Sequence, residues 1–246
     1  SGSTSTKTEA VEQLPLLASL PALPDSSVES AAWATQLDPT GNYARAVRVL
    51  RRSVEIENSL PATFVFAPIA SGDGATTVAS NLAMLLAREG RKIILVDLGF
   101  GQSSIEQALD LKSSDESDKS LGLADALTGA ELISTIRTTS IPGLDAMPAG
   151  TLAEQTDARA LLDSPKMGEL ITHLAAAYDH VIFDAPAIDE GDNTRLVAAL
   201  ADATVIVGRA GSTSRSDLIE ARNSLQMLGA NVIGLVIRND SAGRNS

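Results

Sequence analysis

The sequence predicts an α/β protein in which helices flank both faces of a doubly wound, mostly parallel β-sheet, a Rossmann-like three-layer arrangement. Strand-like and helix-like segments alternate from about residue 43 onward, a pattern that is typical of a parallel sheet with crossover helices. The strand-like segments are uninterrupted apolar runs, such as KIILVD over 92–97. Runs of this kind indicate strands that are covered on both faces.

The first helix is predicted over 44–57, because apolar side chains recur there at helical spacing with arginines between them. The apolar positions are Ala46, Val47, Leu50 and Val54. A strand over 63–67, a glycine-rich turn over 71–74 and a helix over 76–89 follow. Gly90 ends this helix, as glycine commonly does.

The rest of the chain continues the alternation and ends in a short polar segment. The further strands are predicted over 92–97, 144–148, 180–184, 203–207 and 232–237. The further helices are predicted over 121–127, 166–178, 193–200 and 216–228, with a polar surface loop over 110–119. Residues 1–40 are rich in Ser, Thr, Ala and Pro and show little periodicity. We therefore expect a disordered or partner-docking tail over 1–40, one domain over 41–240 and a polar tail over 241–246.

The composition excludes several classes of function. A net charge of −12 disfavours nucleic-acid binding. The chain has no cysteine, which rules out disulfides and thiolate metal sites, and its two histidines, His173 and His180, are too few for a histidine metal cluster. No apolar run approaches the ~20 residues of a membrane-spanning helix, and no signal peptide is visible. We expect a cytoplasmic protein that is not inserted directly into the membrane.

The glycine-rich turn has the pattern of a phosphate-binding loop, which makes the predicted fold P-loop NTPase-like. The candidate nucleotide-binding residues are Gly72, Asp73, Gly74, Ala75, Thr76 and Thr77. A working loop ends in Gly-Lys-Ser/Thr, and Ala75 stands at the lysine position. Loss of one charge-assisted contact weakens nucleotide binding by about tenfold to a few hundredfold, and phosphoryl transfer by more. In the alternative interpretation, the glycines only shape a strand-to-helix turn.

Two carboxylates are predicted at the same edge of the sheet as this loop. Asp97 and Asp184 each end an apolar strand, and the carboxyl ends of parallel strands face the ligand crevice of an open α/β sheet. With Thr76 they are the candidate Mg²⁺ ligands, and they are also the candidate catalytic residues if the chain has any activity. The alternative is that each aspartate caps a helix or a loop.

With these motifs in place, residues 43–240 resemble the cytoplasmic domain of bacterial tyrosine kinases (BY-kinases), which accompany polysaccharide co-polymerases. The matching segments are 48–51, 70–77, 94–97, 121–129 (LGLADALTG), 144–151 (LDAMPAGT) and 178–186 (YDHVIFDAP). The last segment has a Walker B pattern. The two motifs over 121–129 and 144–151 make the match more specific than one to the wider ParA/MinD ATPases.

Several departures from that family remove parts of the phosphoryl-transfer machinery or its usual target. Ala75 replaces the lysine, and Gly99 stands where the family has its second Walker A′ aspartate. The chain has only two tyrosines, Tyr43 and Tyr178, and ends without the family's tyrosine cluster. Several independent losses favour a natural pseudokinase, whereas Ala75 alone could be an engineered substitution.

The resemblance implies a non-catalytic protein that supports capsule, exopolysaccharide or holdfast-type polysaccharide synthesis and export. Its partner would be the cytoplasmic part of a membrane co-polymerase, which recruits it to the inner face of the membrane, and ATP or ADP with Mg²⁺ would bind weakly. The first alternative is a weak ATP-binding tyrosine kinase or ATPase with a rearranged site. The second is a relative of the ParA/MinD positioning ATPases, which the acidic charge disfavours.

Arginines on the first predicted helix are candidates for an interface between copies of the chain. They are Arg45, Arg48 and Arg51. The family's helix typically reads Glu-x-x-Arg-x-x-Arg, and Arg45 stands at the Glu position, a charge reversal that affects the family's ring-shaped self-assembly. The alternative is a solvated helix face.

Overall fold

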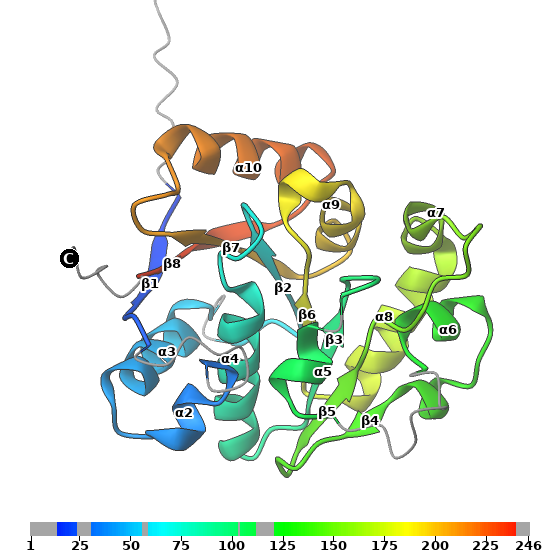
Figure 1. Ribbon diagram of the computed structural model, residues 1–246, viewed down its shortest axis with the longest axis horizontal. Coiled ribbons are helices and arrows are strands. Elements are labelled where there is room, and N and C mark those ends of the chain that lie inside the picture. Colours follow the sequence, from blue (N-terminus) through cyan, green and yellow to red (C-terminus); the bar gives the residue numbers. More distant parts are fainter. Residues whose placement is uncertain (1–13, 24–30, 56–58, 103, 112–120, 240–246) are drawn as a thin grey trace, which may run out of the picture.

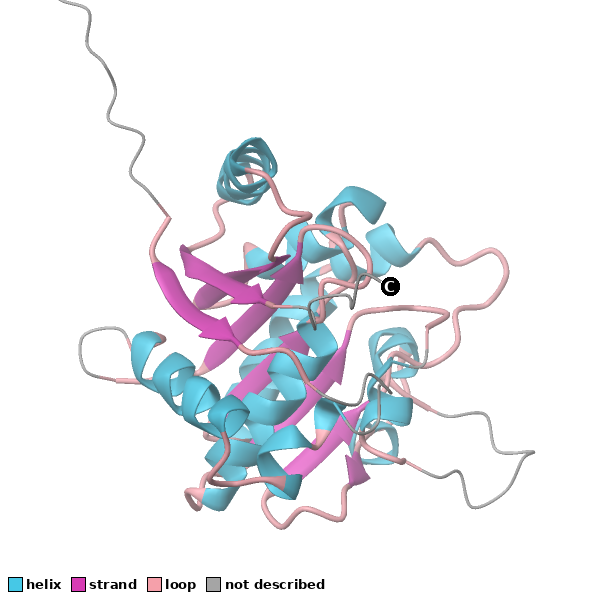
Figure 2. Cartoon of the chain, turned by 60° about the vertical axis from the view of Figure 1, so that its left-hand side comes forward, coloured by secondary structure: helices cyan, strands magenta, loops and turns pink. Residues whose placement is uncertain are grey.

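The computed structural model describes residues 14–23, 31–55, 59–102, 104–111 and 121–239. Its centre is a sheet with the strand order β1-β8-β7-β2-β6-β3-β5-β4, in which β4 alone is paired antiparallel to its neighbour (Figure 1). The strands are β1 (Leu16–Leu20), β2 (Thr63–Pro68), β3 (Ile93–Asp97), β4 (Arg137–Thr138), β5 (Leu144–Met147), β6 (His180–Asp184), β7 (Ala203–Arg209) and β8 (Val232–Arg238). Figure 2 shows these strands lying side by side. The predicted fold class is confirmed.

Helices cover both faces of the sheet. The α-helices with described bounds are α2 (Ala34–Leu37), α3 (Asn42–Ser53), α4 (Ala75–Arg88), α5 (Ser104–Ala108), α6 (Leu123–Thr128), α7 (Ala158–Leu162), α8 (Pro165–Ala177), α9 (Asn193–Ala198) and α10 (Arg215–Met227). Two 3₁₀ turns are η1 (Leu132–Thr135) and η2 (Ile188–Glu190). In the part of the chain that is described, no helix has the length and hydropathy needed to span a membrane.

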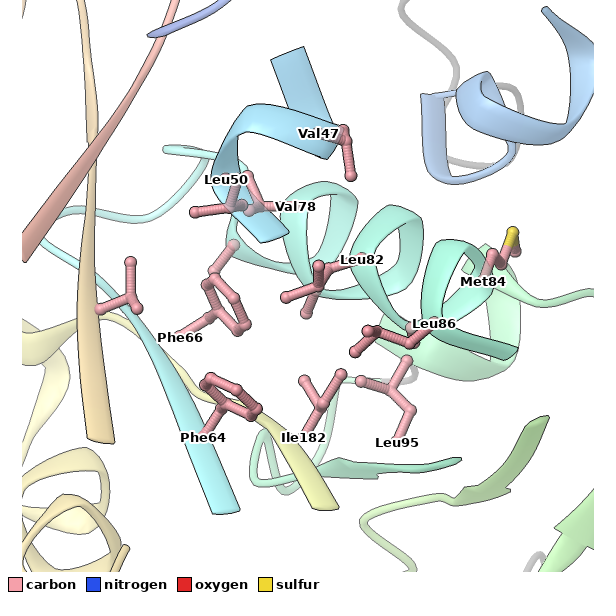
Figure 3. Close-up of a cluster of buried hydrophobic side chains, with 14 of the residues drawn as sticks. Val47, Leu50, Phe64, Phe66, Val78, Leu82, Met84, Leu86, Leu95 and Ile182 are labelled. Atoms are coloured by element: carbon pink, nitrogen blue, oxygen red, sulfur yellow. The ribbon is translucent and has the colours of Figure 1, made fainter. Parts of the chain in front are cut away.

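Alternate residues of the central strand β2 divide the hydrophobic core between the two faces. Phe64 and Phe66 pack into the cluster under α3 and α4, and Figure 3 shows Leu82 and Leu86 of α4 among the neighbouring side chains. Val65 belongs to the opposite cluster, which α6 to α10 cover. Because successive side chains of a strand point to opposite faces, an uninterrupted apolar run such as TFVFA can fill both layers.

The chain before residue 41 departs from the prediction. Residues 16–20 form the edge strand β1, which runs parallel to β8 with Leu20 opposite Arg238. Residues 34–37 form α2, and the backbone N–H of Thr35 donates to Oδ1 of the buried Asn81 at 2.8 Å. The expected tail over 1–40 is therefore wrong for residues 14–23 and 31–40, and the folded domain begins before residue 41.

Other differences are smaller. The first helix ends at Ser53 and not at residue 57. Four predicted connections contain short elements: α5 in the first, η1 and β4 in the second, α7 in the third and η2 in the fourth. Most of the predicted surface loop over 110–119 and the whole tail over 241–246 lie outside the described residues.

Candidate functional site

A pocket of about 580 Å³ lies at the carboxyl edge of the sheet. Its wall is built by the ends of β2, β3, β6 and β8 and by the start of α4. Five of the predicted nucleotide-binding residues line it: Gly72, Gly74, Ala75, Thr76 and Thr77. The predicted carboxylates Asp97 and Asp184 line the same pocket. The fold thus brings the loop and both strand-end aspartates together.

The glycine-rich turn has the backbone shape of an anion cradle. Gly72 and Gly74 have φ angles of 84° and 91°, a region that side chains other than glycine rarely adopt. Gly74 is the N-cap of α4 and has no side chain to cap the helix. The first backbone N–H groups of a helix lack partners within the helix, so those of Ala75, Thr76 and Thr77 are suited to an anion.

Asp73 differs from the other predicted binding residues. It is buried, and its Oδ2 accepts a hydrogen bond from the backbone N–H of Ala70 at 2.9 Å. Its own backbone N–H donates to the carbonyl of Ala70 at 3.2 Å, and its Oδ1 lies 3.9 Å from Nε of Arg209. Burial raises the pKa of its carboxyl. In this geometry Asp73 shapes the loop from within and does not line the pocket.

Ala75 stands at the first position of α4 with 4% of its surface exposed. The loop around it keeps the two left-handed glycines and the helix N-terminus. The side chain at the lysine position ends at Cβ and carries no charge. The loop therefore offers backbone N–H groups to an anion, and residue 75 adds no charge to it. That this is a phosphate loop without its lysine remains a prediction.

The two strand-end aspartates are neighbours in the sheet. Asp97 of β3 and Asp184 of β6 lie opposite one another in the strand register. Both are buried. Burial raises the pKa of Asp184 to about 7, and burial together with the charge of Asp184 raises the pKa of Asp97. Two buried carboxylates of like charge favour a shared proton or a cation between them.

The same residues fit a magnesium ion. The hydroxyl of Thr76 donates to Oδ2 of Asp184 at 2.6 Å. Oδ1 of Asp184 is buried and has no hydrogen-bond partner among the described residues. An oxygen acceptor of this kind beside a second carboxylate suits Mg²⁺, which binds through one or two carboxylates, water and phosphate oxygens. Thr76, Asp97 and Asp184 therefore remain the predicted ligands.

Asp97 also has a structural role. Its Oδ1 accepts a hydrogen bond from the backbone N–H of Gly99 at 2.7 Å, and its Oδ2 accepts from that of Ile105 at 3.4 Å. The carboxylate thus holds the loop after β3 and the start of α5. The alternative interpretation of this residue as a loop cap agrees with these contacts, which leave room for the metal role as well.

Sequence reasoning missed Arg238, the last residue of β8, which lines the pocket. Its guanidinium Nη2 donates to the carbonyl of Gly72 at 3.1 Å. A Cβ placed on Gly74 would lie 2.8 Å from both Cδ and Nε of Arg238, so this side chain lies directly on the loop. A signal for it exists in the sequence, because a charged residue that ends an apolar strand meets the same criterion as Asp97 and Asp184.

The N-terminal segment is another part of the site that sequence reasoning missed. Pro21 and Leu23, which follow β1, line the pocket together with Ala31.

The two tyrosines of the chain are both buried. Tyr43 lines the pocket, and the hydroxyl of Tyr178 donates to Oδ2 of Asp145 at 2.8 Å.

The three arginines predicted as an interface lie on α3. Nη1 of Arg45 donates to Oδ1 of Asn42 at 3.2 Å, and Nη1 of Arg48 donates to the carbonyl of Pro39 at 2.9 Å. Arg51 forms ion pairs with Glu55 and Glu89. Each guanidinium thus has a contact within the chain, and the interface remains a prediction.

Comparison with solved structures places the fold among P-loop NTPases. The kinase domain of the Escherichia coli tyrosine kinase ETK matches with a TM-score of 0.82 and 19% identity, over 95% of this chain and 93% of that chain. The septum site-determining protein MinD of Pyrococcus horikoshii, solved with Mg-ADP, matches with a TM-score of 0.58 and 22% identity, over 75% of this chain and 72% of that chain.

Comparison of sequences agrees with this fold. The tyrosine-protein kinase YwqD of Bacillus subtilis is 24% identical over 213 residues, which are 85% of this chain and 86% of the relative. The predicted resemblance to the bacterial tyrosine kinases is confirmed. A family model described as cellulose biosynthesis protein BcsQ matches residues 62–235. The chain therefore belongs to the BcsQ family of P-loop proteins.

Proposed function

We propose that this protein is a non-catalytic, BY-kinase-like subunit that supports bacterial polysaccharide synthesis and export. It binds the cytoplasmic part of a membrane co-polymerase, which brings it to the inner face of the membrane. It binds Mg²⁺ with ATP or ADP weakly and does not transfer the γ-phosphoryl group at an enzymatic rate. The family described as cellulose biosynthesis protein BcsQ supports the polysaccharide context.

The observation that carries the proposal is Ala75 in an otherwise formed phosphate loop. Gly72 and Gly74 retain the backbone shape of an anion-binding loop. Asp184 accepts a hydrogen bond from the hydroxyl of Thr76. Ground-state binding draws on many backbone contacts, whereas transfer depends on charges directed at the moving phosphoryl group. Losing the lysine therefore reduces catalysis more than it reduces binding. A protein that binds nucleotide without hydrolysing it is suited to act on a partner through its conformation.

The tyrosines support the non-catalytic proposal. The sequence contains two tyrosines, Tyr43 and Tyr178. Both residues are buried. A phosphoryl acceptor must reach the γ-phosphate of a neighbouring copy, and a buried hydroxyl cannot do so in the folded protein.

The partner is tested by co-purification. The full chain is expressed with the cytoplasmic segments of the polysaccharide co-polymerases and polymerases of its source organism, and captured through a tag on this chain. We expect the co-polymerase segment to co-purify at a defined stoichiometry. The matched control is the same capture with an unrelated P-loop ATPase as bait. Absence of every co-polymerase and polymerase component from the captured material would contradict the proposed partner.

A second candidate function is a weak ATPase or tyrosine kinase with a rearranged site. The retained Thr76, Asp97 and Asp184 favour it, because they still suit Mg²⁺. This candidate predicts slow release of phosphate from Mg-ATP that the D184N substitution abolishes. Phosphate release that is the same with and without D184N favours the non-catalytic protein instead.

A further inference from the structure

The described side chains that line the pocket include more acidic than basic groups. Among the described residues of its wall, Asp97, Asp184 and Glu190 are acidic, and Arg238 is the one basic residue. A nucleoside di- or triphosphate adds further negative charge, which one Mg²⁺ offsets only in part. A polyphosphate in this pocket therefore needs a cation from the protein, and Arg238 is in position to supply it.

The fold holds Arg238 against the phosphate loop by several contacts. Arg238 ends β8 opposite Arg209 of β7 and opposite Leu20 of β1. The next residue, Asn239, fixes the strand end, since its backbone N–H and its side-chain Nδ2 each donate to the carbonyl of Leu20 at 2.9 Å. From there the guanidinium reaches the carbonyl of Gly72 at 3.1 Å.

Gly74 makes this approach possible. A Cβ at this position would lie 2.8 Å from Cδ and Nε of Arg238, so the arginine side chain would have to move from its present place on the loop. The absent side chain thus serves two purposes, because it permits the left-handed φ of 91° and gives room for the arginine. The result is a permanently charged group directly on the segment that would cradle a phosphate.

We propose that Arg238 is the phosphate-binding cation of this pocket and offsets the missing lysine at position 75. It makes the pocket selective for nucleoside di- and triphosphates over nucleosides. This inference rests on the nucleotide-binding part of the proposed function and not on the partner. Guanidinium is always charged and offers several donors to phosphate oxygens.

The direction of approach explains how such a site binds without efficient transfer. A loop lysine reaches the phosphates from the first turn of α4, whereas Arg238 reaches the loop from the end of β8. A cation from this side stabilises the bound polyphosphate in its ground state. It does not supply the charge at the lysine's position that favours the transition state.

The test is calorimetric titration of the full chain with Mg-ADP and with adenosine, for wild type, R238Q and R215Q. Arg215 is exposed at the start of α10 and does not line the pocket, so R215Q removes the same charge elsewhere. We expect R238Q to weaken Mg-ADP binding by about tenfold to a hundredfold, with adenosine binding unchanged. R215Q should leave both affinities within about twofold, because exposed distant charges are screened.

Two further variants keep the test decisive. R238K retains the charge and should bind Mg-ADP more tightly than R238Q. If R238Q is unstable, this comparison distinguishes the loss of the charge from a loss of folded protein as the cause of weaker binding. The double variant A75K–R238Q should regain Mg-ADP affinity lost in R238Q, because a lysine at 75 restores a cation to the cradle. Thermal unfolding without ligand checks that each variant is folded.

Several results would overturn the inference. They are equal Mg-ADP affinity of wild type and R238Q, equal losses for Mg-ADP and adenosine, no rescue by A75K, and no Mg-ADP binding by wild type at millimolar concentration. None of them bears on capture of the co-polymerase. Conversely, ATP turnover by wild type would end the non-catalytic proposal and leave the role of Arg238 in binding intact.

Discussion

Replacing Asp184 by asparagine should stabilise the metal-free protein at pH 8 and change its stability little at pH 4. In the wild type, Asp184 lies opposite Asp97 in the sheet, and both side chains are buried. At pH 8 the native state must hold the Asp184 carboxylate ionised in this surrounding. The amide of asparagine has the same shape and no charge, so it removes both the burial of a charge and the repulsion of Asp97.

The magnitude follows from the pKa of Asp184, which burial raises to about 7 in the native state, against about 3.9 in an unfolded chain. Between these values the native state binds a proton that the unfolded state has released, so the free energy of unfolding falls as the pH rises. The full difference corresponds to about 4 kcal/mol. Weakening the charge-assisted bond from Thr76 subtracts about 1 kcal/mol, which leaves a stabilisation of about 2–4 kcal/mol.

The assay is thermal and urea unfolding of wild type and D184N in EDTA at several pH values from 4 to 8. A stabilisation of about 2–4 kcal/mol raises the melting temperature by roughly 5–15 °C at pH 8. The difference between the two proteins should grow from pH 4 to pH 7 and then level off. A wild type as stable as D184N at pH 8, or a difference that shrinks with rising pH, would refute this reasoning.

Three other predictions concern the metal, the N-terminal segment and self-association. Millimolar Mg²⁺ at pH 8 should raise the melting temperature of wild type more than that of D184N, because the ion neutralises the buried carboxylates; equal shifts would contradict the metal site. N81A removes the hydrogen bonds that Asn81 makes to Thr35, Ala31 and Thr77, and should cost about 2–4 kcal/mol of unfolding free energy; a urea midpoint like that of wild type would count against it. The double substitution R48E–R51E should change the mass measured by light scattering if α3 is an interface, and an unchanged mass would remove that idea.

The strands near the site can be predicted almost residue by residue from the sequence. The strand predicted over residues 180–184 is β6, and the strand predicted over 92–97 corresponds to β3 over Ile93–Asp97. Both are apolar runs that end in aspartate, and burial on both faces demands such runs. Their shared edge follows from parallel topology alone, which is why the sequence is enough to bring Asp97 and Asp184 together.

The strand β1 could not be predicted in the same way, because its stability comes from tertiary contacts. Prolines flank it, and five residues carry too little periodic signal. What gives it room is Gly234 of β8, where a Cβ would lie 2.5 Å from Cγ of Leu17. Within the sequence, a glycine inside a strand lowers the local preference for that strand. In the fold, the same glycine lets the side chain of Leu17 pack against β8.

The site shows the same division between local and distant information. Gly72, Gly74 and Thr76 are close in sequence, so the pattern of the loop reveals them. Arg238 comes from the far end of the chain, 166 positions from the carbonyl that it contacts. The motif groups Asp73 with the binding residues by its position, whereas its carboxylate faces the loop's own backbone. Contacts of both kinds depend on side-chain directions that one sequence does not specify.

The most direct measurement is single-turnover hydrolysis of Mg-ATP by wild type, D184N and A75K, with the enzyme in excess over labelled ATP. We expect wild type and D184N to release phosphate at the same background rate, because the proposed function assigns no catalytic cation to position 75 of the loop. Release by wild type at a rate near that of an ordinary kinase, about 1–100 per second, and its loss in D184N, would contradict a non-catalytic site.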